Sequence, residues 1–436
     1  MRSAYTAAPS RTSSALRYLY TLAMYLATPL LMLRLMTRGM RYGSFHQRWS
    51  ERFGVFPAPD LHGSLWVHAV SVGEVNAAEP LIKALQRDYP NAPLVITTVT
   101  QTGSARVHQL FGGSVFHVYL PYDLPFAVRG FLERVRPRLA LIVETEIWPN
   151  LYYACRRRGI PLMIVNARLS ERSLRGYRPL RGLVRPALNS VRLIAAQSRT
   201  DAGRYRSLGA DPTRVIVSGN LKFDMPIPED AVRDGGMLRE QWGRLRPVWI
   251  AASTHEGEEL PVLEAHLEVL QRLPDALLLI APRHPERFKL VENSVRSLGF
   301  AMATRSADRV PGPAQQVFVI DAMGELMPFF AAADLAFVGG SLVPIGGHNV
   351  LEPAALSTPV LVGPHTFNFE EITLTLINEG GAARVTRASQ LGSAVLRLLR
   401  DRPARERMGR LAQVVFDSER GAVKRVIALI DGLLQE

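Results

Sequence analysis

Apolar residues from residue 64 onward fall in short continuous runs separated by stretches with helical spacing. The first runs are LWVHAV, LVITTV, VFHVYL, LALIVET, PLMIVNA, LIAAQS and VIVSG. A strand that is covered on both faces shows no polar alternation, so these runs predict the strands of a buried parallel sheet. The segments between them, such as VNAAEPLIKALQRDYP and PFAVRGFLERVRP, have helical spacing and end at proline. The pattern predicts a doubly wound, Rossmann-like α/β domain.

A second series follows a break in this pattern. FDMPIPEDAVRDGG, residues 223–236, is rich in Pro, Asp and Gly and is typical of a linker. Strand-like runs then resume as VWIAAS, ALLLIAP, VFVID, LAFVGGS and PVLVGP. We expect a leader and anchor segment at 1–40, an N-terminal α/β domain at 41–224, a linker at 225–246, and a second α/β domain at 247–436 that ends in a helix. Because ligands of such sheets bind beyond the carboxyl ends of the strands, two domains facing a central cleft predict an active site in that cleft.

The N-terminal region carries an uncharged apolar run, YLYTLAMYLATPLLML, between Arg17 and Arg34. The run is shorter than the ~20 residues of a usual membrane-spanning helix, and Pro29 interrupts it. Five arginines, starting with Arg34, precede residue 53 and are opposed by one glutamate, which favours a main body on the cytoplasmic side. We predict an N-terminal hydrophobic membrane-anchor helix that either spans the bilayer or lies in its plane.

Composition narrows the possible partners. The chain has 436 residues, of which 47% are apolar and 21% charged, and this is typical of a globular protein. The formal net charge of +13 indicates an anionic partner: nucleic acid, an acidic membrane surface or a phosphorylated substrate. No nucleic-acid-binding motif accompanies the charge, so we expect no nucleic acid and favour a membrane-facing surface. Cys155 is the only cysteine, which excludes an intrachain disulfide and indicates a reducing compartment.

The strongest local signal is a glycine-rich loop between a strand and a helix, FVGGSLVPIGGHNVLEPAALSTPVLVGP. Gly346 and Gly347 allow backbone amides to approach a phosphate, and a helix that begins near Asn349 would add its positive end. Glu352, one turn further on, can accept hydrogen bonds from ribose hydroxyls. The order of these parts predicts nucleotide-sugar binding. Their spacing matches neither a Walker loop nor GxGxxG, which argues against an ATPase or a dehydrogenase.

A second signal, LWVHAVSVGEVNAAEP, places Glu74 where a strand turns into a helix. Negative charge in a first helical turn is stabilising, so Glu74 could be an ordinary helix acid. It could also be a carboxylate that takes a proton at the mouth of a site. The local residues leave both interpretations open.

An ordered series of motifs narrows the choice: HAVSVGE, LPYDLP, VETEIWPN, NARLS, AAQS, GNLKFD, ASTHEGEE, APRHPERF, DAMGEL, FVGGSLVPIGGHN and GPHTFNFEEI. This series closely resembles that of the 3-deoxy-D-manno-octulosonic acid (Kdo) transferases of Gram-negative bacteria. The resemblance implies a two-domain glycosyltransferase of the GT-B type at the cytoplasmic face of the cell inner membrane. It also implies transfer of Kdo from CMP-Kdo onto the lipid A precursor (lipid IVA), with inversion, in lipopolysaccharide core biosynthesis.

The resemblance implies roles for individual residues. Glu74 matches the general base of the family, and Glu144 and Lys222 match positions that stabilise the transition state. Glu146 lies two residues beyond Glu144, on the same side of an extended strand, so the sequence leaves open which of these acids acts. The CMP contacts of the family match Pro282, Arg283, Met323, Gly324, Glu325, Asn349, Val350, Leu351 and Glu352.

No metal or other cofactor is expected. The histidines that follow strands or lie in loops lack the i, i+4 spacing of a zinc motif. There is also no clear DxD motif, and an arginine and a helix end can hold a donor that carries one phosphate. These histidines are His68, His255, His284, His348 and His365.

Two other interpretations remain. A different GT-B transferase, using a UDP- or ADP-sugar with a lipid or heptose acceptor, would keep the glycine-rich loop without keeping the other motifs together. A membrane-tethered two-domain binding protein would also pair two α/β lobes, but such proteins normally act outside the cytoplasm. Substitution of Glu74 distinguishes an enzyme from a binding protein, because only an enzyme has turnover to lose.

Overall fold

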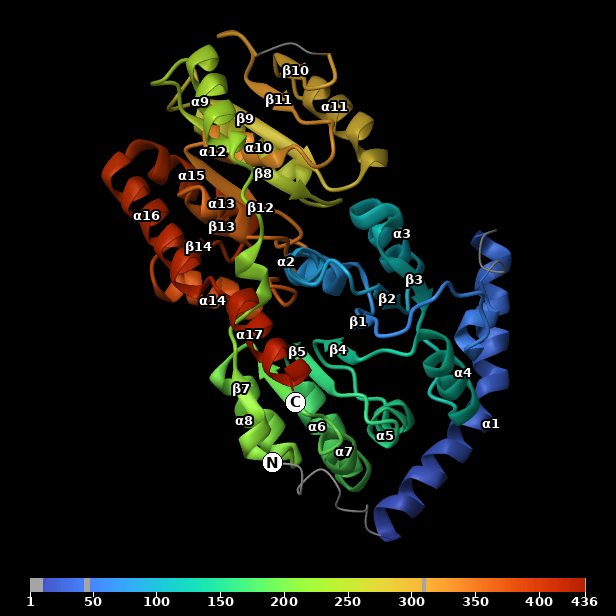
Figure 1. Ribbon diagram of the computed structural model, residues 1–436. Helices are drawn as coiled ribbons and strands as arrows, with labels where there is room; N and C mark the ends of the chain where they lie inside the picture. The colour runs from blue at the N-terminus through green and yellow to red at the C-terminus, as the bar shows by residue number, and fades with distance from the viewer. Residues whose placement is uncertain (1–10, 43–47, 308–310, 436) are drawn as a thin grey trace. The chain divides into compact units, whose positions relative to one another are not determined.

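The computed structural model describes residues 11–42, 48–307 and 311–435. These residues form two compact units, each built on its own parallel β-sheet (Figure 1). Unit 1 comprises Met1–Met225 together with Arg420–Glu436, and unit 2 comprises Pro226–Glu419. Two Rossmann-like α/β domains are therefore confirmed, while residues 1–10 of the expected leader lie outside the described residues.

The sheet of unit 1 has seven parallel strands, and each matches a run predicted from the sequence. In chain order they are β1 (Leu65–His68), β2 (Leu94–Thr98), β3 (Phe116–Tyr119), β4 (Leu139–Val143), β5 (Leu162–Ala167), β6 (Leu193–Ala196) and β7 (Val215–Val217). Their order across the sheet is β3-β2-β1-β4-β5-β6-β7. Trp66 and Ile142 face one hydrophobic layer, and Val67 and Leu141 face the other. Burial on both faces explains why the runs show no alternation.

Helices surround this sheet. They are α1 (Arg11–Tyr42), α2 (Val72–Asp88), α3 (Gln101–Phe111), α4 (Pro125–Val135), α5 (Pro149–Arg157), α6 (Glu171–Tyr177), α7 (Arg181–Leu188), α8 (Arg199–Leu208) and α17 (Ala422–Gln435). Short 3-10 helices complete the unit: η2 (Ser50–Phe53), η3 (Gly112–Ser114), η4 (Arg178–Leu180), η5 (Pro212–Arg214) and η6 (Leu221–Asp224).

The sheet of unit 2 also has seven parallel strands, in the order β10-β11-β9-β8-β12-β13-β14. They are β8 (Val248–Thr254), β9 (Leu277–Pro282), β10 (Met302–Thr304), β11 (Val317–Val319), β12 (Leu335–Val338), β13 (Val360–Val362) and β14 (Ala382–Arg384). Strands β10 and β14 were not predicted, because their sequences, MAT and AAR, include a polar residue and are only partly buried, so neither forms an apolar run. The helices are α9 (Asp230–Trp242), α10 (Glu259–Leu270), η7 (Pro285–Arg287), α11 (Phe288–Ser297), α12 (Leu326–Ala332), α13 (Leu351–Ala355), α14 (Glu370–Asn378), η8 (Ala388–Gln390), α15 (Leu391–Arg400) and α16 (Arg402–Glu419).

Both sheets have a point where the strand order changes direction. In unit 1 the chain winds outward from β1 on one side and from β4 on the other. In unit 2 the direction changes between β8 and β12, although on the β8 side β11 lies between β9 and the edge strand β10. Crossover segments leave such neighbouring strands in opposite directions, which opens a crevice at their carboxyl ends where ligands bind. Functional residues are therefore expected at these two switch points.

Two boundaries differ from the expected domains. The terminal helix α17 packs on unit 1, where Val426 and Ile430 are buried in the core that also contains α2. The Asp224 carboxylate accepts hydrogen bonds from the backbone N–H groups at the start of α17, which anchors the helix there. The expected linker contains α9, whose Trp242 packs against the ring of Phe329, so this segment belongs to unit 2.

Helix α1 continues through Pro29 without a break. In the described residues, no helix combines the length and apolar character needed to cross a membrane, so the spanning form of the expected anchor is not supported. One side of α1 contacts the rest of unit 1: the Tyr20 hydroxyl donates to Asp123 at 3.0 Å, and the Thr21 hydroxyl donates to Asn150 at 3.1 Å. Its exposed apolar residues include Leu16, Leu19, Leu22, Leu26, Leu30 and Leu33.

Candidate active site

The first group of candidate residues lies where β1 passes into α2. Glu74 occupies the first turn of α2, and its Oε2 accepts a hydrogen bond from the backbone N–H of Val70 at 2.6 Å. Glu74 therefore helps to secure the start of the helix, as an ordinary helix acid would. Burial raises the pKa of Glu74 to about 8, and the nearby charges of Glu144 and Glu146 also act to raise it. A carboxyl group with such a pKa can exchange a proton with a substrate near neutral pH.

Glu144 and Lys222 lie beside Glu74. Glu144 is the first residue after β4, which pairs with β1 in the sheet. Lys222 lies in η6, and its Nζ is 3.8 Å from Oε1 of Glu144. The positive charge of Lys222 also acts to lower the pKa of Glu74, against the larger effect of burial. The three residues expected to be catalytic are thus neighbours at the switch point of unit 1.

The strand that leads to Glu144 ends earlier than expected. Strand β4 ends at Val143, and Glu144 has a φ of +59°, in the left-handed region that non-glycine residues seldom adopt. Hydrogen bonds hold this strained backbone, since the Glu144 N–H donates to Val165 O at 3.0 Å. The expectation that Glu144 and Glu146 share one side of a strand is therefore wrong. Glu146 is nevertheless near, and burial raises its pKa to about 7, with a further contribution from Glu144.

Asn166 orients the Lys222 turn, although the sequence did not single it out. It lies in β5 with a φ of +51°, and its Oδ1 accepts the N–H of Leu221 at 2.9 Å. Asn220 makes the next contact, since its Oδ1 accepts the Lys222 N–H at 3.0 Å. Two side-chain amides therefore position η6. The available signal was a lone Asn at the end of the apolar run PLMIVNA.

The second group of candidates lies in unit 2, beyond the carboxyl ends of β9 and β12. The Asn349 Oδ1 accepts the N–H of Leu351 at 3.1 Å, and its Nδ2 donates to Glu352 Oε1 at 3.1 Å. Burial raises the pKa of Glu352, while the hydrogen bond from Asn349 and the charge of Arg283 oppose that rise. Arg283, Asn349 and Glu352 therefore form one electrostatically connected group. Buried beside them are Pro282, Val350 and Leu351.

The glycine-rich loop differs in detail from the expected phosphate cradle. The N–H groups of Gly346 and Gly347 both donate to the carbonyl of Gly340, at 3.0 and 2.7 Å, and so hold the loop itself. A Cβ at Gly346 would lie 2.4 Å from the ring of Phe367, which explains the need for glycine. Helix α13 begins at Leu351 and has only five residues, so its dipole contributes little.

Met323, Gly324 and Glu325 follow the carboxyl end of β11, the neighbour of β9 in the sheet. All three are exposed, and Glu325 forms an ion pair with Arg305 at 3.0 Å. The parallel strands place these residues on the same edge of the sheet as the group around Arg283.

Glu258 connects the loops of this edge. Its buried carboxylate accepts hydrogen bonds from the N–H groups of His255, Gly340, Ser341 and Leu342, at 2.6–3.0 Å. One side chain therefore fixes the loop after β8 to the loop after β12. Glu258 lies in the motif ASTHEGEE, but nothing in the sequence indicates that it reaches residues about eighty positions away.

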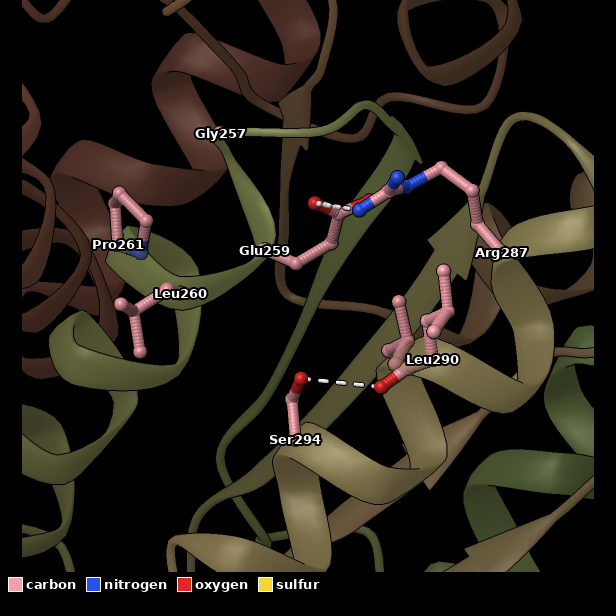
Figure 2. Close-up of a pocket in the computed structure, with 8 residues that line it drawn as sticks. Gly257, Glu259, Leu260, Pro261, Arg287, Leu290 and Ser294 are labelled. Carbon is pink, nitrogen blue, oxygen red and sulfur yellow. Dashed lines mark hydrogen bonds and ion pairs between the residues drawn. The ribbon is translucent and has the colours of Figure 1, made fainter.

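A separate pocket of about 370 Å³ lies between the N-terminal parts of α10 and α11. Figure 2 shows Arg287 and Glu259 pointing toward one another, joined by hydrogen bonds of 2.8 and 3.1 Å. Leu260 and Leu290 line the pocket, and each is more than half exposed, at 52% and 54%. The expected CMP contacts are not among its lining residues. The pocket thus shows how Arg287 is held to α10.

The five candidate histidines occupy different places. His255, His284 and His348 lie together in unit 2, and His365 follows β13. His68 is buried in the sheet of unit 1, where its Nδ1 lies 2.9 Å from the Thr97 hydroxyl. Across the part of the chain that the structure describes, no three His, Cys, Asp or Glu side chains are arranged to hold a metal ion.

Comparison with known proteins supports the resemblance. Residues 47–225 match the family model of 3-deoxy-D-manno-octulosonic-acid transferase (kdotransferase). A 3-deoxy-D-manno-octulosonic acid transferase of Haemophilus influenzae is 41% identical over 423 residues, which cover 96% of this chain and 99% of the relative. The corresponding protein of Bordetella pertussis is 39% identical over 433 residues, with the same coverage of 96% and 99%.

A solved structure agrees at the level of the fold. A glycosyltransferase of Rickettsia africae superimposes with a TM-score of 0.57 over 87% of this chain and 100% of its own, at 11% sequence identity. Identity this low supports only the two-domain fold. The relatives that are about 40% identical over nearly the whole chain support more, and the chain belongs to the 3-deoxy-D-manno-octulosonic acid transferase family of glycosyltransferases.

Proposed function

We propose that the protein transfers Kdo from CMP-Kdo onto the lipid A precursor lipid IVA, with inversion at the anomeric carbon, in lipopolysaccharide core biosynthesis. Membership of the family supports the transfer of Kdo. The observation that carries the mechanism is the group formed by Glu74, Glu144 and Lys222 at the switch point of unit 1. It combines a carboxyl group of raised pKa with a charged pair.

Glu74 acts as the general base in this mechanism. The attacking hydroxyl of the acceptor must lose a proton as it bonds to the anomeric carbon of Kdo, and a carboxylate within hydrogen-bond reach accepts that proton. Because burial raises the pKa of Glu74 to about 8, its carboxylate is a stronger base than that of an exposed glutamate. Only the deprotonated fraction is active, so the rate is limited below this pH.

Lys222 and Glu144 stabilise the charges of the transition state. Negative charge develops on the departing phosphate while the sugar ring gains oxocarbenium character. The Lys222 ammonium stabilises the departing phosphate or the Kdo carboxylate, and the Glu144 carboxylate stabilises the ring. Before substrate binds, their separation of 3.8 Å lets each charge compensate the other.

The donor is held by unit 2. Arg283 can bind the single phosphate of CMP-Kdo with two hydrogen bonds, and the Glu352 carboxylate can accept hydrogen bonds from the ribose hydroxyls. Asn349 keeps Glu352 oriented through its bond of 3.1 Å. A donor with one phosphate needs less cationic compensation than a diphosphate, so we propose that transfer requires no divalent metal ion.

We further propose that the enzyme works at the cytoplasmic face of the inner membrane, with α1 in the plane of the interface. The exposed leucines of α1 recur every three or four residues and so share one face of the helix. The bond between Tyr20 and Asp123 holds another side of the helix to unit 1. The net charge of +13 suits an anionic surface that carries a phosphorylated lipid acceptor.

The test measures transfer of Kdo from freshly made CMP-Kdo to lipid IVA, in EDTA, by the mass of the product. We expect transfer by the wild type and a loss of about 10²–10⁴-fold in kcat for Glu74→Gln, with CMP binding retained. Glu79→Gln is the matched control, because Glu79 lies on the same helix and pairs with Lys83 away from the site. If folded wild type transfers nothing from CMP-Kdo, the assignment fails, and UDP- and ADP-sugars become the donors to test.

A further inference from the structure

Two histidines form a direct pair at the carboxyl edge of the unit 2 sheet. His255 follows β8, and His348 lies in the glycine-rich loop after β12. Their Nε2 atoms are 2.7 Å apart, their ring centroids are 4.9 Å apart and their ring planes are nearly parallel, at 3°, so the two nitrogens point toward each other. At this distance one Nε2 carries a hydrogen that the other accepts. In the neutral pair, one of the two Nδ1 atoms therefore remains unprotonated.

The protein holds this pair in place from both sides. Glu258 accepts the backbone N–H of His255 at 3.0 Å and that of Gly340 at 2.6 Å, which ties the two histidine loops together. The ring of His348 packs against Gly340, where an added Cβ would lie 2.9 Å from the ring. The close approach of the two rings is therefore built into the loops.

Basic side chains lie around the pair. His284 meets His255 edge to face with ring centroids 5.1 Å apart, and Arg283 lies next to His284 in the chain. Burial, together with the charges of His255, Arg283 and His284, lowers the pKa of His348 to about 3. Burial also lowers the pKa of His255, with contributions from His284, Arg283 and Arg287. Without a ligand, the pair is neutral at physiological pH.

The acids near the pair are already engaged. Glu258 accepts hydrogen bonds from four backbone amides, and Glu259 is joined to Arg287, as Figure 2 shows. Glu256 also pairs with Arg287, at 3.5 Å. Glu352 of α13 is hydrogen-bonded to Asn349. These acids are therefore engaged by backbone amides, Arg287 and Asn349, so Arg283 and the histidine pair are the groups at this edge that an anionic ligand would contact.

We propose that His255 and His348 are donor-binding residues, which contact the phosphate of the nucleotide beside Arg283 and take up one proton from solvent when it binds. This inference rests on the proposed function, because it assumes a CMP-linked donor in unit 2. The added proton goes to the Nδ1 that was unprotonated. The Nε2–H···Nε2 bond is kept and becomes charge-assisted, and the positive charge lies against the phosphate.

The sign of the pH effect follows from linkage. Binding of the anion raises the proton affinity of the pair, so the complex holds more protons than the free protein. Donor affinity must then fall as pH rises, by at most about tenfold per pH unit for one linked proton. This trend opposes that of Glu74, whose deprotonation increases kcat as pH rises. The KM of the donor and kcat therefore respond to separate groups.

The test is titration calorimetry of CMP into the full chain at pH 7.5, in PIPES and in Tris. These buffers differ in their enthalpy of protonation, so any proton uptake appears as a difference in the measured binding enthalpy. Free CMP is almost wholly dianionic here, because the second pKa of a phosphate monoester is about 6. We expect uptake of up to about one proton in the wild type, and a value near zero in both His255→Gln and His348→Gln.

Control ligands and variants separate the possible outcomes. Cytidine lacks the phosphate and should cause no uptake, while free Kdo tests whether the sugar carboxylate is the anion instead. His62→Gln, which removes an exposed histidine of unit 1, should leave the uptake unchanged.

Three outcomes would each overturn the inference: CMP binding with equal enthalpy in both buffers, proton uptake that persists in both histidine variants, or proton uptake with Kdo alone. If CMP fails to bind at all, the proposed donor itself is wrong. If one histidine variant does not fold, the inference is still tested by the wild-type binding enthalpies in the two buffers and by the other variant.

Discussion

The two units share a fold but carry different titratable side chains at equivalent places. At the switch point of unit 1, three acids crowd together, and burial raises the pKa values of Glu74 and Glu146. At the switch point of unit 2, histidines crowd around Arg283, and burial lowers the pKa values of His255 and His348. The sheet thus supplies the place, and the loop residues set its chemistry, which in the proposed function is proton abstraction in unit 1 and donor binding in unit 2.

The two sites also differ in how they are held. Asn166 and Asn220 orient the Lys222 turn through single hydrogen bonds to its backbone. In unit 2, the buried Glu258 carboxylate gathers four backbone N–H groups from two loops. Loss of a site side chain should therefore lower the rate of transfer in unit 1, but disturb the loop structure in unit 2. Four measurements examine this difference.

Of these four measurements, the largest effect is expected for Lys222→Met. Removing the ammonium should lower kcat by about 10²–10³-fold, because a charge that stabilises the transition state is lost. Lys222 also acts to lower the pKa of Glu74, so the pH midpoint of kcat should move upward in this variant. The pH profile of Kdo transfer measures both effects, with Lys83→Met on α2 as the control. An unshifted pH midpoint would show that the charge of Lys222 does not affect the pKa of Glu74.

Glu258→Gln should destabilise the loops that the Glu258 carboxylate holds together. The amide presents an NH₂ group to backbone donors that now share a carboxylate, and unsatisfied buried donors cost about 1–3 kcal/mol each. We expect the free energy of unfolding to fall by about 3 kcal/mol and CMP affinity to fall at least tenfold. Urea unfolding and CMP titration provide the measurements, and the exposed Glu264→Gln on α10 is the control. Unchanged stability would show that these hydrogen bonds are dispensable.

In the wild type, the pH dependence of kcat should come from unit 1, and the pH dependence of the KM for CMP-Kdo should come from unit 2. Burial raises the pKa of Glu74 to about 8, so kcat should rise about tenfold per pH unit below that value and level off above it. The KM of CMP-Kdo should rise over the same range if the histidine pair binds protons with the donor. Steady-state kinetics at pH 6.5–9 would show the two trends. A kcat that is independent of pH, with chemistry rate-limiting, would exclude Glu74 as the base.

The smallest effect is expected at α1. Leu22→Glu combined with Leu26→Glu should weaken binding to anionic vesicles several-fold, because two exposed apolar side chains on one face become charged. CMP affinity should not change, since the donor residues lie in unit 2. Vesicle flotation gives the comparison with Leu245→Glu, a control at a residue that is 88% exposed in unit 2. Equal losses in both variants would point to charge alone and not to α1.

Much of the fold was predictable from the sequence, because the sequence of a strand that is buried on both faces is an unbroken run of apolar residues. Every run used to predict a strand proved to contain one. Strands β10 and β14 were missed, since each includes a polar residue, unlike the equally short β7, β11 and β13. Helix α17 was placed with the wrong domain because an amphipathic pattern shows that a helix has a buried face, but not which core buries it.

The site was predictable only in part. Motifs indicated Glu74, Glu144 and Lys222, and the structure brings these residues together. The contacts of Glu258 and the pairing of His255 with His348 join segments about eighty and ninety residues apart, and no local pattern reports such contacts. The glycine-rich loop differs from the expected phosphate cradle, since the N–H groups of Gly346 and Gly347 donate to the carbonyl of Gly340 in the same loop.

The return of α17 to unit 1 has a consequence for synthesis of the chain. Residues 226–419 form unit 2 without a break, so they can fold as soon as they emerge from the ribosome. One core of unit 1 is completed later, because Val426 and Ile430 belong to it and the start of α17 provides the partners of Asp224. Although unit 1 begins the chain, its core around α2 is therefore completed by residues that are made after the whole of unit 2.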